Sequence, residues 1–140
     1  DAAQWRSDLE SVFDVDGLVY LAVEPEFVAD KMKEFFESIS ELLSQELTIT
    51  EAFYSAAFIH LVFVHIHPFS DGNGRAARLL EKWFLAQTFG QNMWSIQSEK
   101  YYKEHKSVYY EKINLGVNYY ELDYSKCMPF LLMLSDSVGG

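Results

Sequence analysis

The sequence of 140 residues is poor in cysteine and in basic residues, with one cysteine and 11 lysines and arginines against 21 acids. One cysteine cannot form an internal disulfide, and no CxxC or Cys/His spacing typical of a zinc site occurs. This favours a reducing compartment, and we expect the cytoplasm, either of the producing cell or of a host cell if the protein is secreted as an effector. A net charge of −10 argues against binding to nucleic acid or to an anionic membrane surface, because both require a basic surface.

Long apolar runs, internal repeats and low-complexity linkers are also lacking. The longest apolar run, residues 52–66, is too short to cross a bilayer and predicts a buried helix instead. We expect no signal peptide from this sequence, and a start at Asp1 without a methionine favours a processed or excised fragment. The length and an apolar fraction of 49% predict one domain over residues 1–140 with a single hydrophobic core.

The local patterns predict an all-α helical bundle with one β-hairpin. Residues 12–24 place β-branched and aromatic residues on both sides of Asp16-Gly17, which favours a type I′ turn centred on this pair. Thr50 is expected to cap the second helix, and Pro68 to end it at His67. Apolar residues recur with helical spacing over the ranges 27–46, 51–66, 73–89, 98–115 and 125–135.

The stretch HPFSDGNGR, between the second and third predicted helices, concentrates residues that could bind an anion. Gly72 and Gly74 allow successive amides to converge at the start of a helix, where free N–H groups and the helix dipole favour negative charge. Arg75 and Arg78 are three residues apart on that helix, so both guanidinium groups can reach the same phosphate oxygens. These residues predict a phosphate-binding site.

Asp71 and His67 would add a metal ligand and a base to this site. A carboxylate beside a polyphosphate suits Mg²⁺, and an imidazole can accept a proton from an incoming nucleophile. Each part also has a plainer interpretation, since such a glycine-rich stretch is most often a turn and a lone histidine is most often structural. A histidine-based metal site lacks a matching acid or cysteine nearby, and no Walker sequence GxxxxGK[ST] occurs.

Residues 67–78, HPFSDGNGRAAR, resemble the signature HPFx[DE]GNGRxxR of the Fic family at every specified position. Most members transfer AMP from ATP to a Ser, Thr or Tyr hydroxyl of a target protein. The hairpin resembles the family's flap, and the surrounding helices resemble its core. The resemblance implies His67 as general base, Mg²⁺ on Asp71, and ATP bound by Gly72, Asn73, Gly74, Arg75 and Arg78.

The resemblance also implies a target protein that pairs its backbone with the flap, at Gly17, Leu18, Val19 and Tyr20. A Tyr-Tyr pair would bind the adenine. Residues 101–102 and 109–110 are both Tyr-Tyr pairs, and Tyr109-Tyr110 is favoured because the residues after it resemble the family better. Packing of these tyrosines with their hydroxyls at the rim is an equally good interpretation.

Several alternatives stay open within and outside the family. Transfer of another group such as phosphocholine is compatible with the signature, whereas Gly74 argues against phosphate transfer, which relatives carry out with a lysine at this place. A non-catalytic adaptor that binds nucleotide or peptide would need neither His67 nor Asp71. The inhibitory motif [ST]xxxE[GN] of many members is not found, because a lysine follows both Ser-to-Glu spacings, at 95–99 and 107–111. We therefore expect inhibition, if any, to come from other sequence or from a separate antitoxin-like partner.

Overall fold

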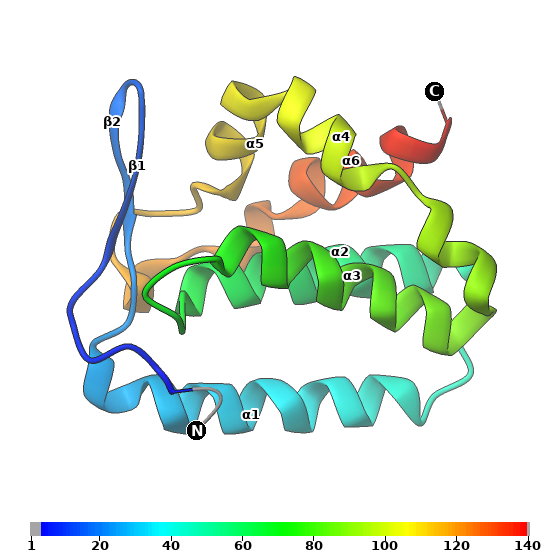
Figure 1. Cartoon of the computed structure of the whole chain (residues 1–140), viewed down its shortest axis with the longest axis horizontal. Helices are drawn as coiled ribbons and strands as arrows, with labels where there is room; N and C mark the ends of the chain where they lie inside the picture. The colour runs from blue at the N-terminus through cyan, green and yellow to red at the C-terminus, as the bar shows by residue number, and fades with distance from the viewer. Residues whose placement is uncertain (1–3, 140) are drawn as a thin grey trace.

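The structure, a computed structural model, describes residues 4–139. Within these residues an N-terminal hairpin is followed by a bundle of helices, which confirms the predicted fold class (Figure 1). The hairpin consists of β1 (Ser11–Asp14) and β2 (Gly17–Leu21). The α-helices are α1 (Pro25–Leu43), α2 (Ile49–Ile66), α3 (Asn73–Phe89), α4 (Ser98–Glu104), α5 (Lys106–Ile113) and α6 (Met128–Gly139), with short 3-10 helices η1 (Gln91–Ser95), η2 (Tyr119–Glu121) and η3 (Tyr124–Lys126).

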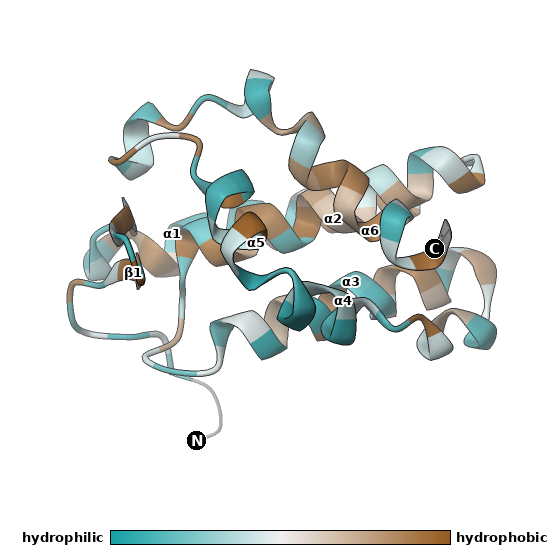
Figure 2. Ribbon diagram, turned by 90° about the horizontal axis from the view of Figure 1, so that it is seen from above, coloured by the Kyte–Doolittle hydropathy of each residue, from teal (hydrophilic) through white to brown (hydrophobic). Residues whose placement is uncertain are grey.

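The apolar helix α2 is the centre of the bundle, with α1, α3 and α6 packed around it. Its brown ribbon in Figure 2 reflects a sequence that is apolar on most sides. The helix is longer than the apolar run that predicts it, and by length and composition it could cross a membrane. Because α1, α3 and α6 cover it, the helix serves as the core helix of the bundle.

The start of α2 lies earlier than expected, since Thr48 and not Thr50 is its N-cap. The Thr48 hydroxyl accepts a hydrogen bond from the Glu51 amide at 3.1 Å, and the Glu51 carboxylate accepts one from the Thr48 amide at 2.9 Å. This capping box satisfies two main-chain donors at once, so it stabilises the helix start more than a lone threonine at position 50.

The predicted helix over residues 98–115 is broken at His105, which has φ −117° and ψ 40° and separates α4 from α5. The His105 ring stacks on Tyr101, and its Nδ1 hydrogen-bonds the Tyr101 carbonyl at 2.8 Å. The His105 amide donates to the same carbonyl at 3.0 Å, so α4 keeps its last hydrogen bond and the break lies in the main-chain angles of His105. The last helix starts at Met128 rather than at 125, because the Asp123 side chain accepts the Ser125 amide and fixes a 3-10 turn there.

The hairpin turn differs from the predicted type I′ turn at Asp16-Gly17. The turn residues are Val15 and Asp16, between the paired residues Asp14 and Gly17. Neither Val15 nor Asp16 has the positive φ that a type I′ turn requires, whereas Gly17 after them has a φ of 120°. The Asp14 carboxylate accepts the Asp16 amide at 2.7 Å, which stabilises a turn one residue earlier than the predicted one.

A β-bulge at Val19 sets which side chains of the hairpin face the core. Val12 pairs with Tyr20 and Phe13 pairs with Leu18, so Val19 is an extra residue in β2. Val19 and Tyr20 therefore both point inward and are buried, although they are neighbours, while Leu18 stays exposed. The bulge anchors the base of the hairpin to the bundle and leaves its tip in solvent.

Candidate active site

The connection between α2 and α3 begins with His67, the C-cap of α2, in a left-handed conformation with φ 54° and ψ 60°. Among residues 4–139 it is the only non-glycine residue with positive φ. Pro68 has no N–H group and cannot donate to the Val64 carbonyl one helical turn earlier. The Tyr20 hydroxyl donates to that carbonyl instead, so a residue of the flap supplies the hydrogen bond that the end of α2 lacks.

Arg6 also contacts this end of α2, and sequence analysis missed it. Its guanidinium donates to the carbonyls of Ile66 and His67, at 3.1 and 2.5 Å, and to the carbonyl of Val23 after β2. The Arg6 amide donates to the Pro68 carbonyl at 2.8 Å. Arg6 is far from the signature in the sequence, and its only local signal is that it is the one arginine outside the signature.

The glycines of the signature give the two arginines room to fold back over the start of α3. Gly72 is the N-cap with φ 82°, and a Cβ there would lie 3.1 Å from Nη2 of Arg75. A Cβ on Gly74 would lie 3.2 Å from Nη1 of Arg78. Both guanidinium groups therefore lie against the first turn of α3, where free amides and the helix dipole favour an anion.

The Asn73 side chain has a different role from the predicted phosphate contact. Its Oδ1 accepts the Phe69 amide at 2.9 Å and its Nδ2 donates to the Phe69 carbonyl at 2.8 Å. Both polar atoms are thus used within the loop, and the residue is buried. Asn73 holds the shape of the loop, and its main-chain amide at the helix start is the group that can face an anion.

Two hollows meet at the signature. The wider one, of about 380 Å³, is lined by residues of the signature alone: His67, Ser70, Asp71, Gly72, Asn73, Gly74, Arg75 and Arg78. A narrower crevice, of about 110 Å³, extends toward the flap and α5 and is lined by Val12, Tyr20, Val64, His67, Asn73, Gly74, Arg78, Tyr109, Tyr110 and Ile113. His67, Asn73, Gly74 and Arg78 border both hollows, so the two hollows adjoin at these residues.

The environment of His67 favours the neutral imidazole. Burial lowers its pKa, the Arg6 guanidinium lowers it further, and the Glu10 carboxylate and the Val64 carbonyl oppose this effect. Nδ1 is buried, whereas Nε2 lies 3.9 Å from a Glu10 carboxylate oxygen. At neutral pH the ring is therefore unprotonated and can accept a proton, with Nε2 as the accessible nitrogen.

Asp71 and Arg75 form an exposed ion pair at the rim of the wider hollow, with 3.6 Å between Oδ2 and Nη2. The Asp71 side chain is 93% exposed, so this pair contributes little to stability and its carboxylate can exchange partners. No group of three His, Cys, Asp or Glu residues within residues 4–139 could hold a metal by itself. A single carboxylate next to a helix start with free amides would suit Mg²⁺ that takes its other ligands from a phosphate group and from water.

The two tyrosines favoured for the adenine differ in their surroundings. Tyr109 is buried, and its hydroxyl hydrogen-bonds Nε2 of His60 at 2.8 Å. Burial also raises the pKa of this hydroxyl. Both tyrosines line the crevice, and the hydroxyl of Tyr109 faces His60 rather than the rim, whereas Tyr110 also lines a hollow under the flap tip beside Phe13 and Lys106.

The four flap residues expected to pair with a target differ in the exposure of their side chains. Val19 and Tyr20 point into the core, so their side chains cannot contact a target, whereas Leu18 is exposed and Gly17 lies at the turn. The edge of β2 is covered at Leu21, whose amide donates to the Val117 carbonyl at 2.6 Å. Within residues 4–139 the outer edge of β1 pairs with no strand.

A buried polar network behind the arginines was also missed. Glu81 on α3 accepts the Tyr102 hydroxyl at 2.8 Å and lies 3.2 Å from Nδ1 of His60. All of these side chains are buried, and with Tyr109 they connect α2 and α3 to α4 and α5. His65 is likewise a structural residue, since its ring nitrogens lie 2.7 Å from the Tyr124 hydroxyl and from the Ile113 carbonyl. The spacing of polar residues on α3 gives no signal that distinguishes this network from solvent-facing positions.

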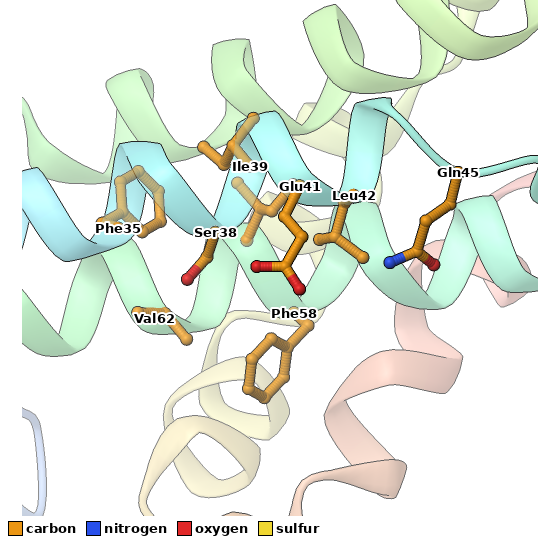
Figure 3. A pocket seen from close by; sticks show the side chains of 9 residues that line it. Phe35, Ser38, Ile39, Glu41, Leu42, Gln45, Phe58 and Val62 are labelled. Atoms are coloured by element: carbon orange, nitrogen blue, oxygen red, sulfur yellow. The ribbon is translucent and has the colours of Figure 1, made fainter.

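The groove between α1 and α2 is a hollow of a different kind (Figure 3). It has a volume of about 290 Å³, and Phe35, Ile39, Leu42, Phe58 and Val62 supply most of its lining. None of the signature residues reaches it. Its polar lining consists of Ser38, Glu41 and Gln45, and it has neither a histidine nor a cation that could bind a phosphate, so it gives no reason to place phosphate chemistry there.

Comparison with known proteins identifies the family. A model of the Fic/DOC family matches residues 3–85. Protein adenylyltransferase fic-1 of Caenorhabditis elegans is 42% identical over 62 residues, which are 44% of this chain and 11% of that protein. Protein adenylyltransferase Fic of Nematostella vectensis is 38% identical over 80 residues, or 57% of this chain and 17% of that protein.

The crystal structure of a Fic domain containing signaling protein from Bacteroides thetaiotaomicron has the same fold. Its TM-score is 0.71 at 24% identity, over 97% of this chain and 55% of that one. The chain spans less than a fifth of the length of the two curated relatives. The match of the family model over more than half of the chain, including the whole hairpin and signature, shows that this chain belongs to the Fic/DOC family.

Proposed function

We propose that this chain transfers AMP from ATP to a hydroxyl group of a target protein, with His67 as the general base. One observation carries the proposal. The complete signature folds so that a neutral imidazole, the amides of a helix start and two arginines border the same hollow. The names of the sequence relatives, which are protein adenylyltransferases, support the same reaction.

The proposed reaction is a displacement at the α-phosphorus of ATP. The hydroxyl oxygen of the target forms a bond to the α-phosphorus as Nε2 of His67 accepts the hydroxyl proton. The bond from the α-phosphorus to the bridging oxygen of the β-phosphate breaks, and pyrophosphate leaves. Main-chain amides at the start of α3, together with Arg75 and Arg78, stabilise the negative charge on the phosphates.

Asp71 is the residue that would hold Mg²⁺, which when bound would neutralise part of the phosphate charge. The exposed Asp71 carboxylate would then leave Arg75 and turn to the ion. Asp71→Ala is expected to lower the rate of transfer and to raise the Mg²⁺ concentration needed for half-maximal rate. An unchanged Mg²⁺ dependence in this variant would contradict the role given to Asp71.

The flap would hold the target segment beside His67. The free outer edge of β1 offers main-chain donors and acceptors to an extended segment, and the exposed side chains of Phe13, Val15 and Leu18 surround the tip. The base of the flap is fixed through the Tyr20 hydroxyl on α2. A rigid flap of this kind would place the target hydroxyl at a defined distance from the imidazole.

The test is transfer of label from ATP labelled at either the α- or the γ-phosphate, in the presence of Mg²⁺ and a lysate that contains candidate targets. Only label that depends on His67 is counted, because kinases in the lysate label proteins from the γ position by themselves. His67-dependent label from the α position only, lost in His67→Ala and retained in the exposed control His105→Ala, is the expected result. His67-dependent label from the γ position would show phosphate transfer, and His67-dependent label in a parallel assay with choline-labelled CDP-choline but not with ATP would show phosphocholine transfer. ATP binding without any labelled protein, including the enzyme itself, would indicate an adaptor, and each of these results overturns the proposal.

A further inference from the structure

We propose that Arg6 is a positioning residue that holds the main chain of His67 in its left-handed conformation and fixes the imidazole relative to the base of the flap. This inference concerns a residue outside the signature and rests on the proposed function of His67. It follows from the contacts of the Arg6 side chain with the carbonyls of Ile66 and His67 at the end of α2 and with the Val23 carbonyl after β2. A fourth hydrogen bond, to the Asp8 carbonyl at 2.8 Å, stays within the N-terminal segment.

The main chain at His67 needs support from other residues. A left-handed conformation is unfavourable for a residue with a Cβ and persists only where surrounding contacts hold it. The end of α2 also leaves carbonyl groups without helical donors, and Pro68 removes one further donor. Without added donors, the carbonyls of Ile66 and His67 would lose their hydrogen bonds inside the protein.

The guanidinium of Arg6 supplies these donors from a buried position. Arg6 is 5% exposed, and its fork of N–H groups reaches the carbonyls of Ile66 and His67 while the Arg6 amide reaches the Pro68 carbonyl. Charge-assisted hydrogen bonds are stronger than neutral ones, and the planar fork loses little freedom when it binds several acceptors. A lysine has its donors on a single atom and cannot reach the same set of carbonyls.

The same guanidinium connects His67, the proposed general base, to the flap. It donates to the Val23 carbonyl, directly after β2, so one rigid group joins the two elements that would present the base and the target hydroxyl. Proton transfer requires these two groups within hydrogen-bond distance, and a misplacement of about 1 Å can lower a rate about 100-fold. Arg6 therefore acts on the reaction through geometry, without touching the substrate.

The neighbours of Arg6 in the sequence contact the same loop. The Trp5 ring lies 5.5 Å from the ring of Phe69, and the Glu10 carboxylate lies 3.9 Å from Nε2 of His67. The segment from Trp5 to Glu10 thus covers the loop, and Arg6 is the member whose hydrogen bonds fix the main chain. The Arg6 guanidinium and the Glu10 carboxylate are the charged groups that shift the pKa of His67, while Asp71, Arg75 and Arg78 line the same hollow as its ring.

The experiment compares Arg6→Gln and Arg6→Lys with Lys33→Gln, which makes the same change in charge as Arg6→Gln on the exposed side of α1. Steady-state transfer of AMP, ATP affinity and thermal unfolding are measured for each variant. We expect both Arg6 variants to lose kcat by about 100-fold while the Kd for ATP changes less than about twofold, because the displaced group is the base and not the phosphate site. Lys33→Gln is expected to match the wild type in all three.

A second measurement follows the His67 ring by NMR and needs no activity. In Arg6→Gln the ring resonances are expected to move and to titrate at higher pH than in the wild type, because a cation that lowers the pKa of His67 has been removed. Arg6→Lys keeps the charge, so its ring resonances should move with a smaller change in the titration. If Arg6→Gln does not fold, Arg6→Lys alone decides the matter through kcat and the ring resonances.

The two proposals fail in different ways. A wild-type protein that transfers no AMP to any target contradicts the proposed function, whereas displaced His67 resonances in an Arg6 variant would still support the structural role of Arg6. An active wild type whose folded Arg6 variants keep kcat and the ring resonances overturns the role of Arg6. A loss of activity that only follows the unfolded fraction of the variant also overturns it, because stability alone would then explain the effect.

Discussion

The hydroxyl of Tyr20 is predicted to contribute stability out of proportion to its size. It donates to the Val64 carbonyl, which lacks a helical donor because residue 68 is proline. Tyr20→Phe removes this hydroxyl and keeps the ring, which packs edge-on against His65 at 5.1 Å. The variant therefore isolates one buried hydrogen bond between the flap and α2.

The magnitude follows from leaving a buried acceptor without its donor. Such a loss costs about 1–3 kcal/mol, more than the net value of an ordinary exposed hydrogen bond. We expect the free energy of unfolding to fall by about 2 kcal/mol, with a drop in Tm of about 4–8 °C for a chain of this size. Urea unfolding followed by circular dichroism measures the first value, and a thermal scan measures the second.

Tyr120→Phe is the matched control, since it removes the same group from an exposed site where the hydroxyl donates to Glu24 at 2.7 Å. This variant should change stability by no more than about 0.5 kcal/mol. Equal losses in Tyr20→Phe and Tyr120→Phe, or no loss in Tyr20→Phe, would refute the reasoning that the flap satisfies the end of α2.

Three further outcomes are expected. Glu10→Gln removes a carboxylate that raises the pKa of His67, so the fall of the transfer rate on the acid side should move to lower pH in a pH–rate profile, and a move to higher pH would be contrary evidence. Glu81→Leu leaves buried hydrogen-bond partners unpaired and should lower the free energy of unfolding by about 3 kcal/mol in urea, whereas a neutral effect would show that the buried network adds nothing. Tyr109→Phe should lower Tm and leave ATP affinity unchanged, whereas Tyr110→Ala should lower ATP affinity and leave Tm nearly unchanged. Thermal scans and isothermal titration calorimetry measure the two quantities, and equal effects of the two variants would contradict the separate roles given to these tyrosines.

The parts of the site that could be predicted are those encoded locally. The signature specifies residue types at fixed spacing, and the loop and the start of α3 need little beyond that spacing to form. The expected helix over 73–89 corresponds to α3 for this reason. The all-α class follows equally from the periodicity of the longer helices, which packing does not override.

The remaining parts depend on contacts between residues far apart in the sequence. Arg6 and His67 are 61 positions apart, and only the folded chain brings them together. Tyr109 is near the site as expected, but the sequence does not show that His60 takes its hydroxyl. The side-chain amide of Asn73 could donate to a phosphate or to a loop carbonyl, and only the structure shows that it donates to the Phe69 carbonyl.

The bulge at Val19 also bears on how proteins of this kind acquire new partners. At the bulge and below it, Val19 and Tyr20 are buried in the bundle, so their replacement would cost stability. Above it, Phe13, Val15 and Leu18 support no core contact and are free to diverge. One inserted residue thus separates a buried framework from an exposed tip. Under the proposed function, exchange of these three side chains is expected to change which target segment is modified while His67 and its supports stay unchanged.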